Sequence, residues 1–592
     1  MILQTIDWLI ILAVLASTMG IGILVSRKSG MNTTEYFLSG RRMPWWLLGM
    51  SMVATTFSTD TPNLVTSIVR QNGVSGNWVW WAFLLTGMLT VFVYARLWRK
   101  SGVTTDLEFY ALRYGGKPAR FLRGFRAIYL GVVFNVLAMA GVTLAAIKIG
   151  EVMMGLPPLA TVGIASTITV IFSALGGFRG VLYSDLLLFF LAMIGAIGAA
   201  YFIVNIPEVG GLSGLLEHPN VRGKLSMIPD FNDTEMVVTI LIIPLAVQWW
   251  SSWYPGAEPG GGGYVAQRML AAKDENHAIG ATFLFNAMHY ALRPWPWILV
   301  ALASLVLFPD LESIKEAFPN VADDKLGDDL GYSAMLTMLP KGLAGLVVAS
   351  LVSAYMSTIS THLNWGASYV VHDFYREFVD TKADEKKLVL IGRLTTILLM
   401  FFSAILALFL QDALQLFVFI LAFGAGTGLI FILRWFWWRI NAWSEISAMI
   451  ASGVVSILLN IPSINQAIFS HTLPGWSKFP IIVFISTFIW VMVTYLTKPE
   501  KKDVLERFYK QIQPGGPGWT KISSQIDQSE LLDEPWDIPR GIIAMLLGCG
   551  FVYGILFTTG MLIYGDYTNG LIMAFISLVF GYLLFKYKPK VI

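Results

Sequence analysis

The feature that most constrains this chain is a succession of long apolar segments. A helix that crosses the hydrocarbon core of a bilayer needs about 20 consecutive apolar residues. The 592-residue chain contains fifteen stretches of roughly that length or longer, at 4–25, 45–69, 76–96, 127–153, 159–176, 183–206, 235–256, 280–308, 333–372, 389–410, 413–434, 442–461, 479–497, 541–563 and 568–586. Only 13% of the residues are charged, against about 25% in soluble proteins. The sequence therefore predicts an all-α polytopic membrane protein.

Lysine and arginine residues are distributed unequally between alternate loops. Of the 41 basic residues, 32 fall on the side that holds the loop between the first two spans. Cytoplasmic loops accumulate Lys and Arg, so we expect the N-terminus outside and the C-terminus in the cytoplasm. We expect the protein to lie in the inner or plasma membrane of the cell. The first segment lacks a basic leading region, which favours a retained helix over a signal peptide. The longest polar stretch, 498–540, is typical of a cytoplasmic linker.

Two of the predicted spans are interrupted by polar residues, proline or glycine. The second span packs hydroxyl groups, Asp60 and Pro62 into mid-membrane, and the seventh ends in Pro255 and the glycines 260–263. Non-helical backbone at membrane depth is tolerated only where it lines a protein cavity, and matching discontinuities in two halves mark the binding site of an inverted-repeat transporter. A carboxylate at the bilayer centre costs about 3 kcal/mol, which favours a functional role for residues 52–62. For 255–263 a binding role and a cytoplasmic glycine-rich turn are equally supported.

The ninth span carries four hydroxyl groups within five positions, at 357–361. Ser357, Ser360 and Thr361 share one helical face. Ala354, Ser357 and Thr358 form a second set that overlaps the first at Ser357. Hydroxyl and carbonyl oxygens are the ligands that a hard alkali cation requires, although hydroxyl groups in membrane helices also bond to their own carbonyls or hold helices together. Asp185 begins the sixth span, where it either completes a second cation site or pairs with Arg179 at the membrane interface.

Four motifs at consistent spacing carry a family resemblance. They are Phe-Leu-Ser-Gly-Arg at 37–41, the Gly-Gly to Asp segment 176–185, Gln-Arg-Met-Leu-Ala-Ala-Lys at 267–273, and the segment 354–375. With them the chain resembles the sodium:solute symporter family across most of residues 1–440. That family includes bacterial sodium/proline, sodium/galactose and sodium/sialic acid transporters.

The resemblance implies a LeuT-type fold built from two inverted repeats of five helices, with one extra helix before them and about four after them. The expected organisation is an extra helix and cytoplasmic loop at 1–44, the first repeat at 45–206, the second at 207–440, extra helices at 441–497, the cytoplasmic linker at 498–540 and two C-terminal helices at 541–592.

The resemblance also implies residues that bind sodium. The first sodium site would use the backbone carbonyls of Ala54, Phe57 and Ala354 with the hydroxyls of Ser357 and Thr358. A second site would use Asp185, Ser357, Ser360 and Thr361. All of these side chains are present, so we predict two bound Na⁺ ions.

The solute is less well defined by the sequence. The sugar-binding Glu and Ser of the galactose transporter fall at Trp80 and Phe83, and its Lys falls near His289, so that recognition set is not transferable. The residues expected to line the solute site are Thr55, Thr56, Asp60, Trp80, Phe83, Trp253 and His289. His289 and Arg293 lie one turn apart. Either the two together hold a carboxylate of the solute, or Arg293 pairs with a neighbouring carboxylate of the protein. The tryptophans favour a sugar or sugar derivative, with amino acids and organic acids as alternatives, although single tryptophans are also common at membrane interfaces.

Together these features favour a sodium-coupled symporter that imports a small polar solute by alternating access. A symporter-like solute sensor and a sodium or solute channel are competing hypotheses. An enzyme is disfavoured, because the chain has one cysteine, scattered histidines and no nucleophile–base or metal-ligand constellation, so no catalytic residue is predicted. The expected partners are the solute, sodium and the lipid bilayer, with neither a nucleic acid nor an obligate protein partner.

Overall fold

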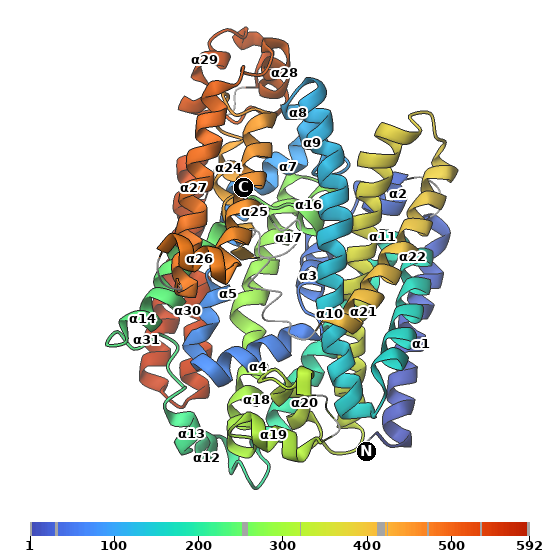
Figure 1. Ribbon diagram of the computed structural model, residues 1–592, viewed down its shortest axis with the longest axis vertical. Coiled ribbons are helices and arrows are strands. Elements are labelled where there is room, and N and C mark those ends of the chain that lie inside the picture. The colour runs from blue at the N-terminus through green and yellow to red at the C-terminus, as the bar shows by residue number, and fades with distance from the viewer. Residues whose placement is uncertain are drawn as a thin grey trace.

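The computed structural model consists of helices that run between two opposite ends of the molecule (Figure 1). It describes residues 3–588, except 30–32, 252–257, 320, 322, 411–420, 423, 470–472 and 533–535. Within this part of the chain, ten helices are long and apolar enough to cross a membrane: Val74–Ser101, Gly116–Met154, Phe178–Val204, Glu275–Leu307, Leu343–Val379, Glu385–Phe409, Ala442–Asn460, Trp476–Leu496, Ile538–Ile563 and Tyr567–Tyr587.

Four other predicted spans correspond to shorter apolar helices, Thr5–Ile21, Trp45–Thr55, Pro158–Ser173 and Thr234–Ala246. The remaining one, 413–434, lies partly outside the described residues, and its described part contains α24 (Gly428–Leu433). Helical backbone continues without a break over α11 (Pro158–Val204), so residues 177–182, expected to separate two spans, are helical.

Several spans are built from more than one element. The elements that position the site are α9 (Gly116–Ile128), α10 (Asn135–Ile149), α17 (Glu275–Ala287), η8 (Met288–Leu292), α18 (Pro294–Leu307), α20 (Leu330–Leu336), α21 (Leu343–Ser368) and η10 (Tyr369–Val379). The flanking helices are α1 (Thr5–Ser29), α2 (Thr33–Leu38), α22 (Glu385–Phe409), α25 (Ala442–Asn460), α26 (Pro462–Phe469), α27 (Gly475–Leu496), α30 (Ile538–Ile563) and α31 (Tyr567–Tyr587).

Both predicted interruptions are present. Helix α3 (Trp45–Thr55) stops four residues before α4 (Asp60–Asn72) begins. The helical run Thr234–Ala246 ends before Val247, and the next α-helix among the described residues, α16, spans Gly263–Ala271. Gly260 and Gly261 have φ values of 86° and 83°, which glycine adopts without steric cost. Around Gly260, a Cβ would lie 3.0 Å from the Tyr94 ring, so a side chain at this position would crowd that ring.

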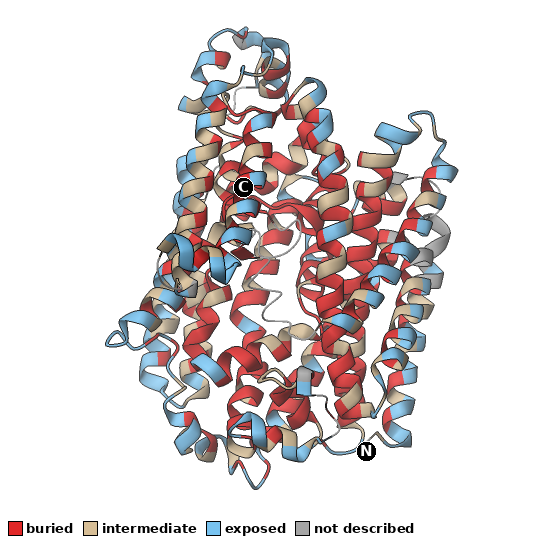
Figure 2. Ribbon diagram, viewed as in Figure 1, coloured by how far each residue is buried: buried red, intermediate tan, exposed pale blue. Residues whose placement is uncertain are grey.

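The distribution of burial separates a central helix from peripheral ones (Figure 2). In the span Leu343–Val379, which contains α21, 83% of the most apolar 18-residue segment is buried inside the protein. In α31 the corresponding share is 17%. Large apolar side chains such as Phe575 and Leu578 of α31 are exposed. Apolar side chains on the outside of a long apolar helix suit contact with lipid tails, so we assign α21 to the protein interior and α31 to the lipid boundary.

The polar stretch 498–540 folds against one end of the bundle. It contains α28 (Lys502–Ile512) and α29 (Thr520–Ser523), and Figure 1 places both at the end opposite α12 (Gly211–Glu217) and α13 (Pro219–Arg222). Trp519 is fully buried and its indole N–H donates to the carbonyl of Trp435 at 2.9 Å. The stretch is therefore packed onto the helices and is not a free tether in its described part.

Candidate functional site

The break between α3 and α4 lies against the middle of α21. The hydroxyl of Thr358 is within 2.9 Å of the carbonyl oxygen of Thr55 and 3.0 Å of that of Phe57, and donates to them. A helix that ends inside the protein leaves carbonyls without helical partners, and burial makes such groups costly unless they are bonded. The unwound stretch near residue 55 and the hydroxyl-rich face of α21 are thus in direct contact.

Arg293 bonds other carbonyls of the same break. Its Nη1 donates to the carbonyl of Val53, and its Nη2 donates to that of Thr56 at 3.0 Å. The guanidinium carbon lies 5.1 Å from the ring centre of Phe57 and 5.3 Å from that of Trp297. Arg293 therefore bonds backbone oxygens and packs on aromatic faces, and it interacts electrostatically with the carboxylate of Asp60, the kind of partner that the sequence suggested as one possibility.

The residues predicted for a first sodium site lie around this contact. Ala54 lies in the last turn of α3 and Phe57 in the break, Ala354 precedes Thr358 by one helical turn, and all four are buried. The carbonyl of Ala54 accepts a hydrogen bond from the backbone N–H of Phe57 at 3.3 Å. The arrangement supplies carbonyl and hydroxyl oxygens in a site screened from bulk water, which is the environment that a hard cation requires.

Ser357, the fifth residue predicted for that site, is directed elsewhere. Its hydroxyl donates to Oδ1 of Asp185 at 2.6 Å, and both residues are fully buried. The hydroxyl of Ser51 in α3 donates to Oδ2 of the same carboxylate. Asp185 therefore joins α11 to α3 and α21, and of the two alternatives that the sequence left open, the pairing with Arg179 at the membrane interface is wrong.

The cationic partner of Asp185 is Arg268 of α16. Nη2 of Arg268 lies 3.4 Å from Oδ2 of Asp185, 3.0 Å from the hydroxyl of Thr361 and 2.8 Å from that of Thr55. The hydroxyl of Ser360 instead donates to the carbonyl of Ser357 at 3.1 Å. The sequence contained Arg268 only as part of a motif. The side chains that it bonds lie 83 to 217 positions away along the chain, so the motif marked Arg268 but could not assign its role.

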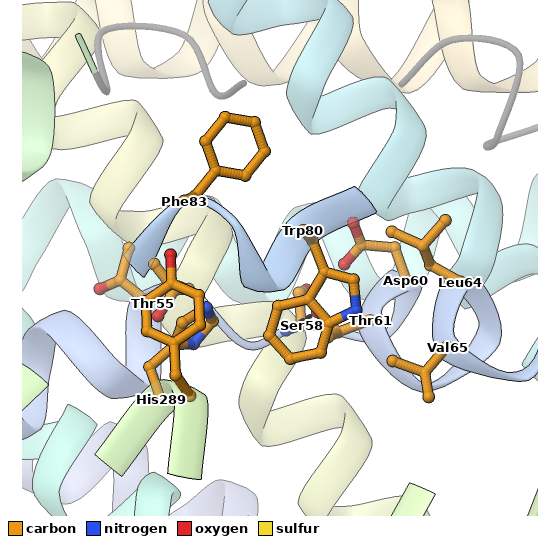
Figure 3. Close-up of a pocket in the computed structure, with 11 residues that line it drawn as sticks. Thr55, Ser58, Asp60, Thr61, Leu64, Val65, Trp80, Phe83 and His289 are labelled. Carbon is orange, nitrogen blue, oxygen red and sulfur yellow. Dashed lines mark hydrogen bonds between the residues drawn. The ribbon is translucent and has the colours of Figure 1, made fainter. Parts of the chain in front are cut away.

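A cavity of about 70 Å³ adjoins the break. Figure 3 shows side chains from α3, α4 and the break between them, from the Val74–Ser101 span and from η8 gathered around it. Six of the residues predicted for the solute site line this cavity, namely Thr55, Thr56, Asp60, Trp80, Phe83 and His289. The seventh, Trp253, lies outside the described residues. The lining residues missed from the sequence are Ser58, Thr61, Leu64, Val65 and Tyr290, each within five positions of a predicted one.

The cavity combines an aromatic wall with one carboxyl group. The rings of Trp80 and Tyr290 are stacked, with centres 5.9 Å apart and planes 26° apart, and His289 contacts both. The Trp80 indole N–H donates to the Asn77 amide oxygen at 2.8 Å, which fixes the ring. Asp60 is the first residue of α4, where the helix dipole favours negative charge. The cavity therefore suits a small polar solute with a flat apolar face.

Ion pairs hold elements together on both sides of the cavity. Toward one end, Arg70 pairs with Asp328 at 2.9 Å and Lys148 pairs with Asp329 at 2.7 Å. Toward the other, two arginines and two glutamates form a buried cluster, in which Arg126 contacts Glu258, and Arg434 contacts Glu258 and Glu445 at 3.3 Å each.

Comparison with known proteins identifies the family of this chain. A model of the family described as "Sodium:solute symporter family" matches residues 36–452. The chain belongs to the sodium:solute symporter family. It is 24% identical over 494 residues to the sodium/glucose cotransporter of Vibrio parahaemolyticus, which covers 79% of this chain and 88% of that relative. It is 26% identical over 492 residues to a sodium/mannose cotransporter of Bos taurus, covering 77% and 79% of the two chains.

A solved structure of this family's fold supports the architecture. The chain resembles a Na⁺-coupled sialic acid symporter, solved in a substrate-bound outward-open state, with a TM-score of 0.66 and 19% identity over 84% of this chain and 99% of that one. The predicted all-α, LeuT-type membrane fold is confirmed. This symporter-family protein is a multi-pass membrane protein that couples solute transport to sodium, and it is not an enzyme.

Proposed function

We propose that this symporter imports a sugar or sugar derivative through the cavity beside the α3–α4 break. The observation that carries the proposal is the stacked wall of Trp80 and Tyr290 facing the same cavity as Asp60. An aromatic face packs on the C–H face of a sugar ring, while a carboxylate accepts hydrogen bonds from its hydroxyls. The curated relatives named for glucose, mannose and myo-inositol support the same solute class.

The proposal places two Na⁺ ions beside the solute. The first is held by Ala54, Phe57, Ala354 and Thr358, with Ser357 between the two sites, and the second by Asp185, Ser357, Ser360 and Thr361. The first ion braces the break against α21 and completes the outward-facing solute site, after which the repeats at 45–206 and 207–440 rock and release both cargoes to the cytoplasm. The clustering of basic residues supports a cytoplasmic C-terminus and an extracellular N-terminus in the inner or plasma membrane.

The coupling energy follows from the ion count. Each Na⁺ contributes about 2.3 kcal/mol per 100 mV of membrane potential and about 1.4 kcal/mol for a tenfold gradient. Two ions supply about 7 kcal/mol, which corresponds to roughly a 10⁵-fold solute accumulation at the thermodynamic limit.

A thermal-shift screen of the purified protein tests the proposed function. Sugars, sialic acids, amino acids and organic acids are each added with sodium or with choline. We expect a sugar or sugar derivative to raise the denaturation midpoint in sodium only, because a ligand that binds the folded state stabilises it. Stabilisation by an amino acid or organic acid alone would replace the proposed solute, and stabilisation independent of sodium would contradict coupled binding.

Trp80→Ala is expected to raise the KM for the solute about tenfold with a smaller change in maximal rate. The substitution removes the ring that stacks on Tyr290, and an aromatic contact contributes about 0.5–1.5 kcal/mol beyond its buried area. Uptake into proteoliposomes measures the effect. Trp45→Ala is the matched control, because Trp45 lies on the exposed side of α3. Equal KM values in Trp80→Ala and Trp45→Ala would remove Trp80 from the solute site.

A further inference from the structure

Asp185 lies between the hydroxyl groups of the proposed second sodium site and the guanidinium group of Arg268. The guanidinium of Arg268 is fully buried, and its Nη2 is within hydrogen-bonding distance of Asp185 and Thr361, two of the four residues proposed to bind the second Na⁺. Its Nε donates to the hydroxyl of Ser51 at 2.9 Å, and that hydroxyl donates in turn to Asp185. Arg268 therefore occupies the position from which a cation would contact this oxygen set.

Arg268 and a Na⁺ ion cannot share this position. The hydroxyl of Thr361 accepts from Nη2 at 3.0 Å, and the same nitrogen lies 3.4 Å from Oδ2 of Asp185, so the guanidinium already occupies two oxygens that an ion at this site would need. The two cations would also repel one another in an environment without bulk water. Sodium binding at Asp185 thus requires Arg268 to withdraw.

The structure provides a place for the withdrawn guanidinium. The ring centres of Phe178 and Tyr264 lie 5.4 Å and 5.7 Å from its central carbon, and Nη1 already donates to the carbonyl of Tyr264 at 3.3 Å. Aromatic faces attract a desolvated guanidinium. A change of side-chain rotamer would exchange carboxylate contact for aromatic contact without exposing the charge to lipid.

We propose that Arg268 is a tethered cation that competes with the second Na⁺ for Asp185 and thereby links sodium occupancy to the position of α16. The proposal rests on the second sodium site of the proposed function. With Arg268 on Asp185, α16 is bonded to α3, α11 and α21 through one side chain. The far end of α16 is tied to the chain before α3, where the N–H of Met43 donates to the carbonyl of Ala271 at 3.2 Å. Sodium binding breaks the connection through Arg268 and leaves the one between Met43 and Ala271.

Equilibrium binding of radioactive Na⁺ to the purified full-length protein, without solute, tests the competition. We expect Arg268→Gln to raise sodium affinity at least tenfold, because glutamine removes the competing charge. The gain should disappear in the double variant Arg268→Gln/Asp185→Asn. The matched control is Arg113→Gln, since Arg113 is equally buried but donates to the carbonyls of Arg434 and Trp437, away from both sodium sets.

Unchanged or lower sodium affinity in Arg268→Gln would overturn the competition, as would a gain that persists in the double variant. If Arg268→Gln does not yield a monodisperse protein, Arg268→Lys provides the test. A lysine ammonium lacks the planar fork that reaches three elements, so a gain of at least threefold is expected and no gain would overturn the proposal. Failure of the proposed function would look different, since the wild-type protein itself would then bind no sodium.

Discussion

Thr358→Val is expected to reduce sodium-dependent solute uptake into proteoliposomes at least 100-fold. Valine has nearly the same shape as threonine but lacks the hydroxyl that donates to the carbonyls of Thr55 and Phe57. The substitution removes a proposed sodium ligand and the one hydroxyl proton that two buried carbonyls share, at a cost of about 1–3 kcal/mol. Both effects act at the contact between the break and α21, where we propose that the first ion binds.

Thr396→Val is the matched control for this experiment. Thr396 is also a buried threonine in a membrane helix, but its hydroxyl donates to the carbonyl of Gly392 in its own helix, at 3.0 Å. Uptake by Thr396→Val should stay within about twofold of the wild type. Equal uptake by the Thr358 and Thr396 variants would show that the Thr358 hydroxyl has no part in coupling.

Arg434→Gln is expected to cause the largest loss of stability, about 3–5 kcal/mol. Arg434 is 2% exposed and contacts Glu258, Glu445 and the Tyr110 hydroxyl, the last at 3.1 Å. Without Arg434, the fully buried Glu445 loses its cationic partner, and an uncompensated buried charge is strongly destabilising. Denaturation of the purified protein in detergent, followed by loss of tertiary signal, measures the effect.

Arg120→Gln supplies the comparison for Arg434→Gln. Arg120 pairs with Glu377 at 3.2 Å, but its side chain is 55% exposed, so the loss should be below about 1 kcal/mol. A similar loss in both variants would mean that burial does not set the strength of the Glu258–Arg434–Glu445 cluster.

The sequence predicted those parts of the site that break the apolar pattern. Thr55, Asp60 and the hydroxyls after Ala354 stand out because polar groups are costly in a bilayer, and the structure brings both stretches together. The glycine and proline residues at 255–263 likewise indicated an interruption of the seventh span. The lining of the cavity was predicted largely because it lies within a few residues of these breaks.

The partners of the buried arginines could not be predicted from the chain. Arg268 bonds residues from α3, α11 and α21, and Arg293 bonds carbonyls more than 230 positions away. Such contacts depend on tertiary packing and leave no periodic signal along the sequence. The family resemblance places Ser357 in both sodium sets, and its hydroxyl donates to Asp185, a member of the second set.

The most direct test is a high-resolution structure of the protein determined in sodium and again in choline. We predict a density peak, present only in sodium, in contact with the carbonyl oxygens of Ala54 and Phe57 and the hydroxyl of Thr358. A sodium-dependent peak elsewhere, with none at this contact, would contradict the proposal that the break and α21 together bind the coupling ion.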